Sequence, residues 1–221
     1  MSVTVDILLS LILGFIGYVA VCYYFNGIRW NSGNTAALKL TKNKILYLTV
    51  ALATAVVMIA MLTYYYKLAL LTRIRLVSLV FIILPCAAVD FRLQKIPNEF
   101  ILSALVIRCI IYTVELLVSP ENTWLAFKSQ IIGAIVIAGF FMVLLLAFKN
   151  SIGMGDIKLF AVMGLYQGLW GVINSVFFSL AASFVISIAF LITKKKGRKD
   201  SIAFAPSIFV GTVVAICLAG M

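Results

Sequence analysis

Long runs of apolar residues, separated by short polar stretches, follow one another along most of the chain. They lack the alternation of polar and apolar positions that is typical of a barrel strand. A helix of about 20 apolar residues crosses the hydrocarbon core, and each crossing segment must satisfy its own backbone hydrogen bonds. The pattern therefore predicts an all-α polytopic membrane protein with about eight transmembrane helices. The runs cover residues 7–25, 45–63, 76–89, 100–118, 131–148, 157–169, 172–192 and 202–218.

Composition and linker length give the same class. Of the 221 residues, 64% are hydrophobic and 11% are charged. The linkers are too short for a soluble domain of any size, so we expect one integral membrane domain over residues 1–221. Within it, residues 1–75 supply N-terminal helices and a short cytoplasmic loop, and residues 76–221 form the core. The first run lacks a basic start and a small-residue cleavage site, which favours a retained helix over a signal peptide.

The basic residues predict an orientation, because short loops rich in Lys and Arg stay in the cytoplasm. With eight crossings and the N-terminus outside, thirteen of these residues face the cytoplasm and four face outward, while Arg108 falls inside a helix. This bias accounts for the net charge of +11 without a nucleic-acid partner and adds attraction to membrane lipids. The four outward residues are Lys67, Arg73, Arg75 and Lys128.

Histidine is absent from the chain, and this excludes several kinds of chemistry. Catalysis by Ser-His or Cys-His pairs and metal sites built on histidine are ruled out. The four cysteines lie in or beside apolar runs without a C-x-x-C pair, and no phosphate-binding loop is present. We therefore expect neither a metal nor a cofactor.

Carboxylate chemistry remains, and only seven acidic residues are available. Glu99 suits the dipole of a helix start, and Glu115 is typical of a helix interface. Asp90 and Asp156 differ because each directly abuts an apolar run. Two complete crossings separate them, so both should lie at the cytoplasmic boundary. The adjoining runs span only 14 and 13 residues, which predicts that both acids are recessed below the lipid head groups.

Recessed carboxylates usually mark a function. Two that approach each other cannot both be charged cheaply, so one keeps its proton and the pair supplies an acid and a base together. This is the chemistry of an aspartic protease. Two alternatives stay open at this point: each aspartate caps a helix, or both relay protons in a membrane transporter.

Two local motifs carry a family resemblance. "VDFRLQKIPNEF" and "GMGDIKLFAVMGLYQG", with a late "FAPSIFVG", resemble the type IV prepilin peptidases, which are intramembrane aspartic proteases of the G-x-G-D kind. The resemblance implies a peptidase core over residues 76–221. It also implies removal of the short basic leader of prepilins or pseudopilins at the cytoplasmic face of the plasma membrane. The matching residues are Asp90, Ile96, Pro97 and Asn98, then Gly153, Gly155, Asp156 and Lys158.

The resemblance makes Asp90 and Asp156 the catalytic pair, and the other matching residues suit positioning of the pair or of the substrate. Gly153 and Gly155 let another chain approach Asp156 closely, and Pro97 fixes the entry of a helix. Asn98 can bond locally or to substrate. Lys158 lies about 200° around a helix from Asp156, so snorkelling to lipid phosphates is its simpler role.

Departures from the resemblance narrow the expected activity. Many bacterial members of that family carry a cytoplasmic domain with paired C-x-x-C motifs, associated with methylation of the new pilin N-terminus. Here the corresponding loop, residues 26–44, contains no cysteine, so we expect a peptidase without methyltransferase activity. Presenilin-like proteases share G-x-G-D, but they pair it with a tyrosine-aspartate and a later P-A-L, whereas this chain has "VDF" and "FAPS".

Overall fold

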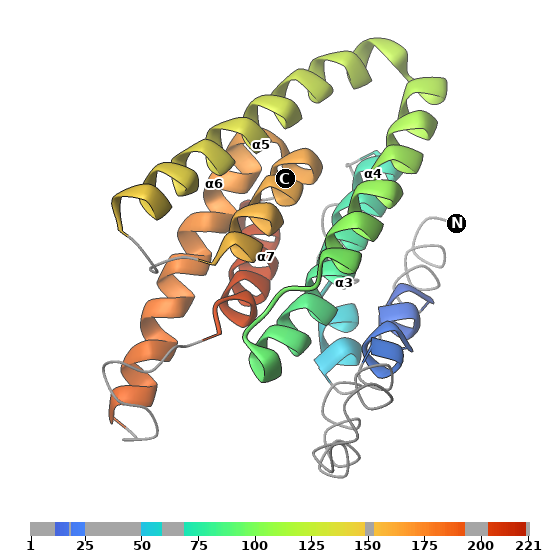
Figure 1. The fold of residues 1–221 in the computed structure, drawn as a ribbon. Coiled ribbons are helices and arrows are strands. Elements are labelled where there is room, and N and C mark those ends of the chain that lie inside the picture. The colour runs from blue at the N-terminus through green and yellow to red at the C-terminus, as the bar shows by residue number, and fades with distance from the viewer. Residues whose placement is uncertain are drawn as a thin grey trace.

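The computed structural model describes residues 12–17, 19–24, 50–58, 69–148, 153–192 and 203–219, and all the regular structure within these ranges is helical (Figure 1). Helical residues occur at 12–17, 19–24 and 50–58, before five longer helices. The all-α prediction is therefore confirmed for the described part of the chain. The longer helices are α3 (Leu70–Leu93), α4 (Asn98–Val118), α5 (Pro120–Ala147), α6 (Met154–Ile192) and α7 (Ala205–Ala219).

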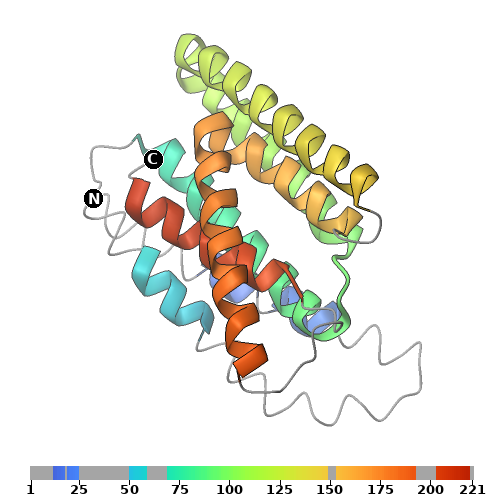
Figure 2. The same ribbon diagram turned by 90° about the vertical axis from the view of Figure 1, so that its left-hand side faces the viewer.

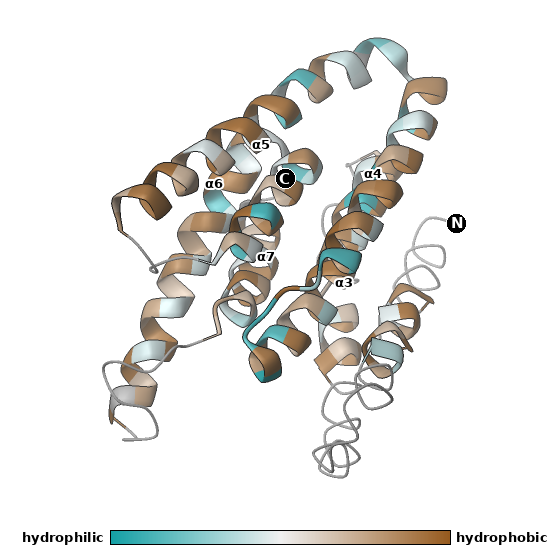
Figure 3. Ribbon diagram, in the orientation of Figure 1, coloured by the Kyte–Doolittle hydropathy of each residue, from teal (hydrophilic) through white to brown (hydrophobic). Residues whose placement is uncertain are grey.

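Four of the described helices are long and apolar enough to cross a membrane. They are Leu70–Leu93, Asn98–Val118, Thr123–Ala147 and Met154–Phe190, and Ala205–Leu218 is a shorter apolar helix. Apolar residues make up most of the described helices (Figure 3), as expected for helices that cross a membrane. These helices indicate an integral membrane protein. The count of eight crossings and the outward position of the N-terminus stay predictions.

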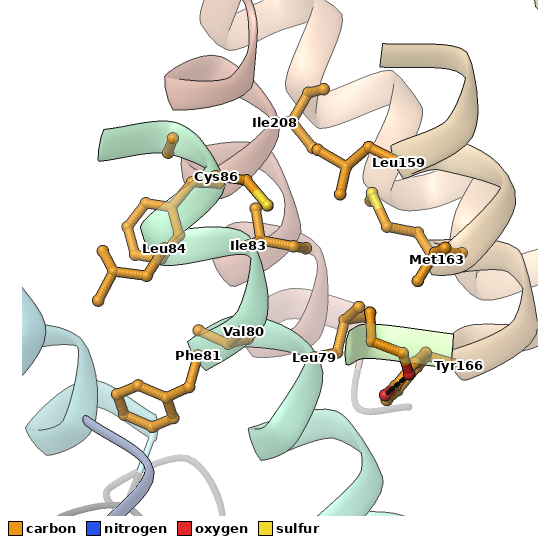
Figure 4. Close-up of a cluster of buried hydrophobic side chains, with 14 of the residues drawn as sticks. Leu79, Val80, Phe81, Ile83, Leu84, Cys86, Leu159, Met163, Tyr166 and Ile208 are labelled. Carbon is orange, nitrogen blue, oxygen red and sulfur yellow. Dashed lines mark hydrogen bonds between the residues drawn. The ribbon is translucent and has the colours of Figure 1, made fainter. Parts of the chain in front are cut away.

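Helix α3 is the central element of the packed core. In its most apolar stretch of 18 residues, 78% of the residues are buried, whereas the share is 22–28% in the other three candidate spans. Leu79, Ile83 and Cys86 of α3 pack in one cluster with residues of α6 and α7, including Met163 and Ile208 (Figure 4). Because protein surrounds α3 on several sides, its C-terminal end, where Asp90 lies, is held in a packed environment.

A sharp kink divides α6 at Gly168. Gly168 has φ 74° and ψ −178°, and the two limbs of α6 diverge from this point in both ribbon views (Figures 1 and 2). The N–H of Leu169 donates to Ser129 Oγ at 3.3 Å, and Arg108 Nε donates to the carbonyl oxygen of Leu165 at 2.9 Å. An uninterrupted helix would pair those two backbone groups with each other. Side chains from α5 and α4 therefore satisfy the backbone where the helix is broken.

Two sequence expectations about helix ends were wrong. Helix α3 has 24 residues and begins at Leu70, so the third helix is not the 14-residue segment expected from its apolar run. Arg73 and Arg75 consequently lie within α3 and not in an outer loop. Arg75 is accommodated there because its Nη1 meets Glu115 Oε1 of α4 at 3.1 Å. The recess of Asp90 therefore comes from packing and not from a short helix.

Candidate active site

The ends of four helices meet around the two motif segments. These are the C-terminal end of α3 and the N-terminal ends of α4, α6 and α7 (Figures 1 and 2). Asp90 lies in the last turn of α3, and Asp156 lies in the first turn of α6. The loop between α3 and α4 carries Ile96 and Pro97. Segments far apart in the sequence thus supply one site.

Asp90 is held against the start of α7. Its side chain is buried, with a residue exposure of 6%, and its Oδ2 accepts a hydrogen bond of 2.9 Å from the N–H of Ala205. The N-terminus of a helix carries unpaired N–H groups and partial positive charge, which stabilise a carboxylate. The Asp90 carbonyl oxygen also accepts the N–H of Gln94 at 2.8 Å where α3 ends. Backbone contacts on both sides therefore fix the position of Asp90.

Asp156 occupies the third position of α6, and Gly153 caps the start of that helix. The Gly153 carbonyl oxygen accepts the N–H of Asp156 at 3.1 Å, and the Asp156 carboxylate in turn bonds the Gly153 backbone. The second bond is the half of a capping box in which the side chain of the third helical residue reaches back to the backbone of the cap residue, here Gly153. The carboxylates of Asp90 and Asp156 also interact electrostatically, so the structure brings the two aspartates into one site.

The glycines leave space that side chains would fill. A Cβ on Gly153 would lie 3.0 Å from Asp156 Oδ2, so only glycine keeps that side of the carboxylate open. A Cβ on Gly155 would lie 3.0 Å from Ile96 Cβ, which places the start of α6 in contact with the loop after α3. The segment that lies against Gly155 is therefore the loop that carries Ile96, while the close approach of another chain to Asp156 stays a prediction.

Asn98 and Lys158 join the two motifs directly. Lys158 Nζ donates to Asn98 Oδ1 at 3.0 Å, linking the first residue of α4 to the first turns of α6. Sequence reasoning left the partner of Asn98 open and favoured snorkelling for Lys158, whereas the structure pairs the two. Pro97 is buried at the N-cap of α4 with φ −64°, as its expected role at a helix entry requires. All eight motif residues therefore gather at one end of the helices.

A buried polar network lies away from this site, and the sequence reading did not predict it. Arg108 Nη2 donates to Glu115 Oε2 at 3.1 Å and to Gln130 Oε1 at 2.5 Å. Glu115 also pairs with Arg75, so one carboxylate lies between two guanidinium groups. The available signal was the occurrence of Arg108 and Glu115 within one apolar run, because ionisable residues in a membrane helix usually pair with one another.

Comparison with known proteins identifies the family. The chain matches the type IV leader peptidase family over residues 76–192, which is more than half of its length. It belongs to that family. The matched range contains Asp90, Asp156 and the loop between α3 and α4.

A related protein gives the same assignment. The chain is 30% identical over 131 residues to a protein of Bacillus subtilis (strain 168) described as a prepilin leader peptidase/N-methyltransferase. That match covers 58% of this chain and 49% of the Bacillus protein, so the chain spans about half the length of this relative. No solved structure matches the chain.

Proposed function

We propose that this leader peptidase family member is an intramembrane aspartic endopeptidase with Asp90 and Asp156 as its catalytic pair. Its substrates are prepilins, pseudopilins or related proteins whose short basic leader precedes an apolar helix, and cleavage occurs at the cytoplasmic face of the plasma membrane. One observation carries the proposal: the two aspartates interact within one site although they come from α3 and α6. Family membership supports a peptidase acting on prepilin-type proteins.

The proposed mechanism divides acid and base work between the two carboxyl groups. The ionised member takes a proton from a water molecule, and the resulting hydroxide attacks the carbonyl carbon of the scissile amide. The protonated member donates a hydrogen bond to the carbonyl oxygen and stabilises the tetrahedral intermediate. A proton then passes to the amide nitrogen as the C–N bond breaks. One shared proton suits the pair because two adjacent carboxylates cannot both ionise cheaply.

Backbone contacts hold both carboxyl groups in place. Asp90 is held by the N–H of Ala205 at 2.9 Å, and Asp156 by the glycine cap of α6. A carboxyl group that is fixed in place loses little entropy when it reaches the reactive geometry, which is the main contribution that a rigid scaffold makes to catalysis. Gly153 leaves one side of the Asp156 carboxylate open, where a peptide bond can enter.

Peptidase activity without methylation is part of the proposal. The Bacillus relative carries N-methyltransferase in its description, but the match covers only 49% of that protein. Residues 26–44 of this chain contain no cysteine for the paired motifs associated with that activity. Mass spectrometry of the mature substrate tests this point: a free N-terminal amine is expected, and a methylated one would overturn it.

Co-expression with a panel of prepilin-type proteins tests the catalytic pair. We expect the parent to shorten a substrate by the mass of its leader, while Asp90→Asn and Asp156→Asn leave it uncut at unchanged membrane levels. Quantitative blotting of membrane fractions measures the amount of each variant. Cleavage that survives either substitution removes that aspartate from the mechanism, and cleavage of no panel member by the parent contradicts the assignment as a prepilin peptidase.

Proton transport through the same aspartates is less well supported. A relay needs further titratable groups that continue toward the other side of the membrane. Among the described residues, Glu115 is the buried acid away from the pair, and it is fixed between Arg75 and Arg108. Both carboxylate oxygens of Glu115 contact arginine side chains, so Glu115 does not extend a path of acids from the pair across the membrane.

A further inference from the structure

Helix α4 holds the first limb of α6, residues 154–167, beside the break in that helix. Arg108 Nε donates to the carbonyl oxygen of Leu165 at 2.9 Å, and the Tyr166 hydroxyl donates to the carbonyl oxygen of Ala104 at 2.8 Å. Ala104 and Arg108 are one turn apart on α4, so each helix donates one of two bonds that join the same pair of turns. We call these two bonds the α4 clamp.

The α4 clamp is buried, since Arg108 and Tyr166 are 5% and 0% exposed. Arg108 Cζ lies 5.8 Å from the centre of the Tyr166 ring. Its Nη2 donates to Glu115 Oε2 and to Gln130 Oε1. A guanidinium group is planar and rigid, so these bonds on one side of the plane determine where Nε points. Arg108 therefore presents its Nε to Leu165 in a fixed direction.

The break at Gly168 separates the first limb from the rest of α6. The Leu165 carbonyl oxygen and the Leu169 N–H bond side chains of α4 and α5, which replace the backbone hydrogen bond that would continue the helix. Apolar packing against α3 and the close approach of Gly164 to Ala134 of α5 hold the limb laterally. Hydrogen bonds are directional, so the α4 clamp fixes the rotation of the limb about its axis and its height along α4.

We infer that Arg108 is a positioning residue for catalysis, because its bond to Leu165 sets the rotation of the first limb and so the place of Asp156 relative to Asp90; the inference rests on the proposed function. Leu165 lies nine residues from Asp156, which is roughly 14 Å of helix. A helix of this length rotates as one body. A rotation of about 20° moves a carboxylate that lies about 5 Å from the helix axis by roughly 2 Å. A displacement of about 1 Å can lower the rate of an enzyme by about 100-fold.

A purely structural role for Arg108 is the competing explanation, because the same side chain joins α4 to α5 through Gln130. Loss of stability lowers the amount of folded enzyme, and the molecules that remain folded keep the kcat and KM of the parent. Loss of position lowers the kcat of the folded enzyme and leaves KM near that of the parent, because only the geometry of the reacting groups has changed. Kinetic constants per folded molecule therefore separate the two roles.

Kinetics of purified full-length variants provides the first test, with a prepilin-type substrate that the parent cleaves. Arg108→Lys keeps a cation near Glu115 but has no donor at the position of Nε, so it should lower kcat about tenfold and leave KM within about twofold. Tyr166→Phe keeps the ring and loses only the bond to Ala104, so it should lower kcat about threefold, also without a change in KM. A kcat of Arg108→Lys within about twofold of the parent value overturns the inference and leaves the peptidase assignment intact.

Thr212→Val is the matched control for these kinetics. Thr212 is fully buried, and its hydroxyl donates to the carbonyl oxygen of Ile208 within α7 at 2.7 Å. The variant therefore loses a buried hydrogen bond that does not join α4 to α6, and it should keep the kcat of the parent. An equal fall in kcat for Thr212→Val and Arg108→Lys would show a general effect of lost buried bonds and overturn the inference.

Disulfide formation provides a second test that needs no substrate. A Cβ on Gly155 would lie 3.0 Å from Ile96 Cβ, and the Cβ atoms of a disulfide lie about 3.5–4.5 Å apart. In a chain whose four native cysteines are replaced, the pair Ile96→Cys and Gly155→Cys should crosslink rapidly under mild oxidation. Adding Arg108→Lys should slow the crosslink at least threefold, because the start of α6 turns away from the loop before α4. Equal rates with and without Arg108→Lys would show that Arg108 does not position this turn, whether or not the protein is a peptidase.

Discussion

At the scale of single residues, Asp90 combines two tasks that are usually separate. Its carboxylate accepts a hydrogen bond from the N–H of Ala205 at the start of α7, and it also interacts electrostatically with Asp156. A capping interaction stabilises a helix by about 1 kcal/mol. An asparagine at position 90 would lose the negative charge but keep an oxygen that accepts the Ala205 N–H. The effects of the charge and of the cap can therefore be measured separately.

We expect Asp90→Asn to abolish cleavage while keeping the thermal stability of the parent, since its amide oxygen replaces the carboxylate at Ala205. Asp90→Ala should abolish cleavage and also lower stability by about 1 kcal/mol, because the buried N–H loses its partner. Thermal unfolding in detergent, together with a cleavage assay, measures both effects. Equal stability of the two variants would show that the contact with Ala205 does not stabilise α7.

The sequence singled out both aspartates as candidates because their position at the edges of apolar runs is a local property. The partner of Asp90 was not predictable in this way, because Ala205 lies 115 residues away and contributes only a backbone N–H. The partner of Lys158 was missed for a related reason. Helical geometry predicts which residues of α6 lie near Lys158, but the Asn98 side chain that bonds Lys158 comes from another helix.

At the scale of helices, the crossing of α5 and α6 depends on two glycines. A Cβ on Gly164 would lie 2.5 Å from the backbone nitrogen of Ala134, and a Cβ on Gly133 would lie 2.7 Å from that of Leu169. Such short distances mean that the backbones approach closely, as membrane helices do where small residues line the interface. The crossing positions the first limb of α6, which carries Asp156 at its start.

We expect Gly164→Ala to destabilise the protein by about 1–3 kcal/mol, because the added methyl group meets backbone atoms that cannot move aside cheaply. Gly139→Ala is the matched control, since a Cβ there has no neighbour within 4 Å and alanine is the better helix former. Thermal unfolding of both variants in one detergent makes the comparison. A Gly164→Ala variant as stable as the Gly139→Ala variant would contradict the close crossing.

Helix positions followed the apolar runs well, but helix ends did not. The runs at 157–169 and 172–192 were predicted as separate helices and correspond to the two limbs of α6, which meet at Gly168. Helices α3 and α5 begin earlier than their runs, at Leu70 and Pro120. The part of α3 before its apolar run contains Arg73 and Arg75. From sequence alone, two charged residues favour a loop over a membrane helix, because the partner of Arg75, Glu115, is not known at that stage. That partner is set by tertiary packing.

At the scale of the whole molecule, α3 and α4 carry polar residues at two levels along their length. Arg75 and Glu115 lie toward one end of the pair, and Asp90 and Asn98 lie at the other. Fifteen residues of α3 separate Arg75 from Asp90, which is roughly 22 Å of helix and fits within a hydrocarbon core of about 30 Å. The ion-paired layer can therefore lie within the outer half of the membrane when the aspartates lie near its cytoplasmic boundary.

Accessibility of the two ends of α3 and α4 tests this orientation. Single cysteines are placed at Lys95, in the loop before α4, and at Glu121, in the first turn of α5, after Cys22, Cys86, Cys109 and Cys217 are replaced. Both positions are exposed. A membrane-impermeant maleimide should label position 121 in intact cells and position 95 only after permeabilisation, because basic loops remain inside. The reverse pattern would place the aspartates at the outer face, where a leader that stays in the cytoplasm could not reach them.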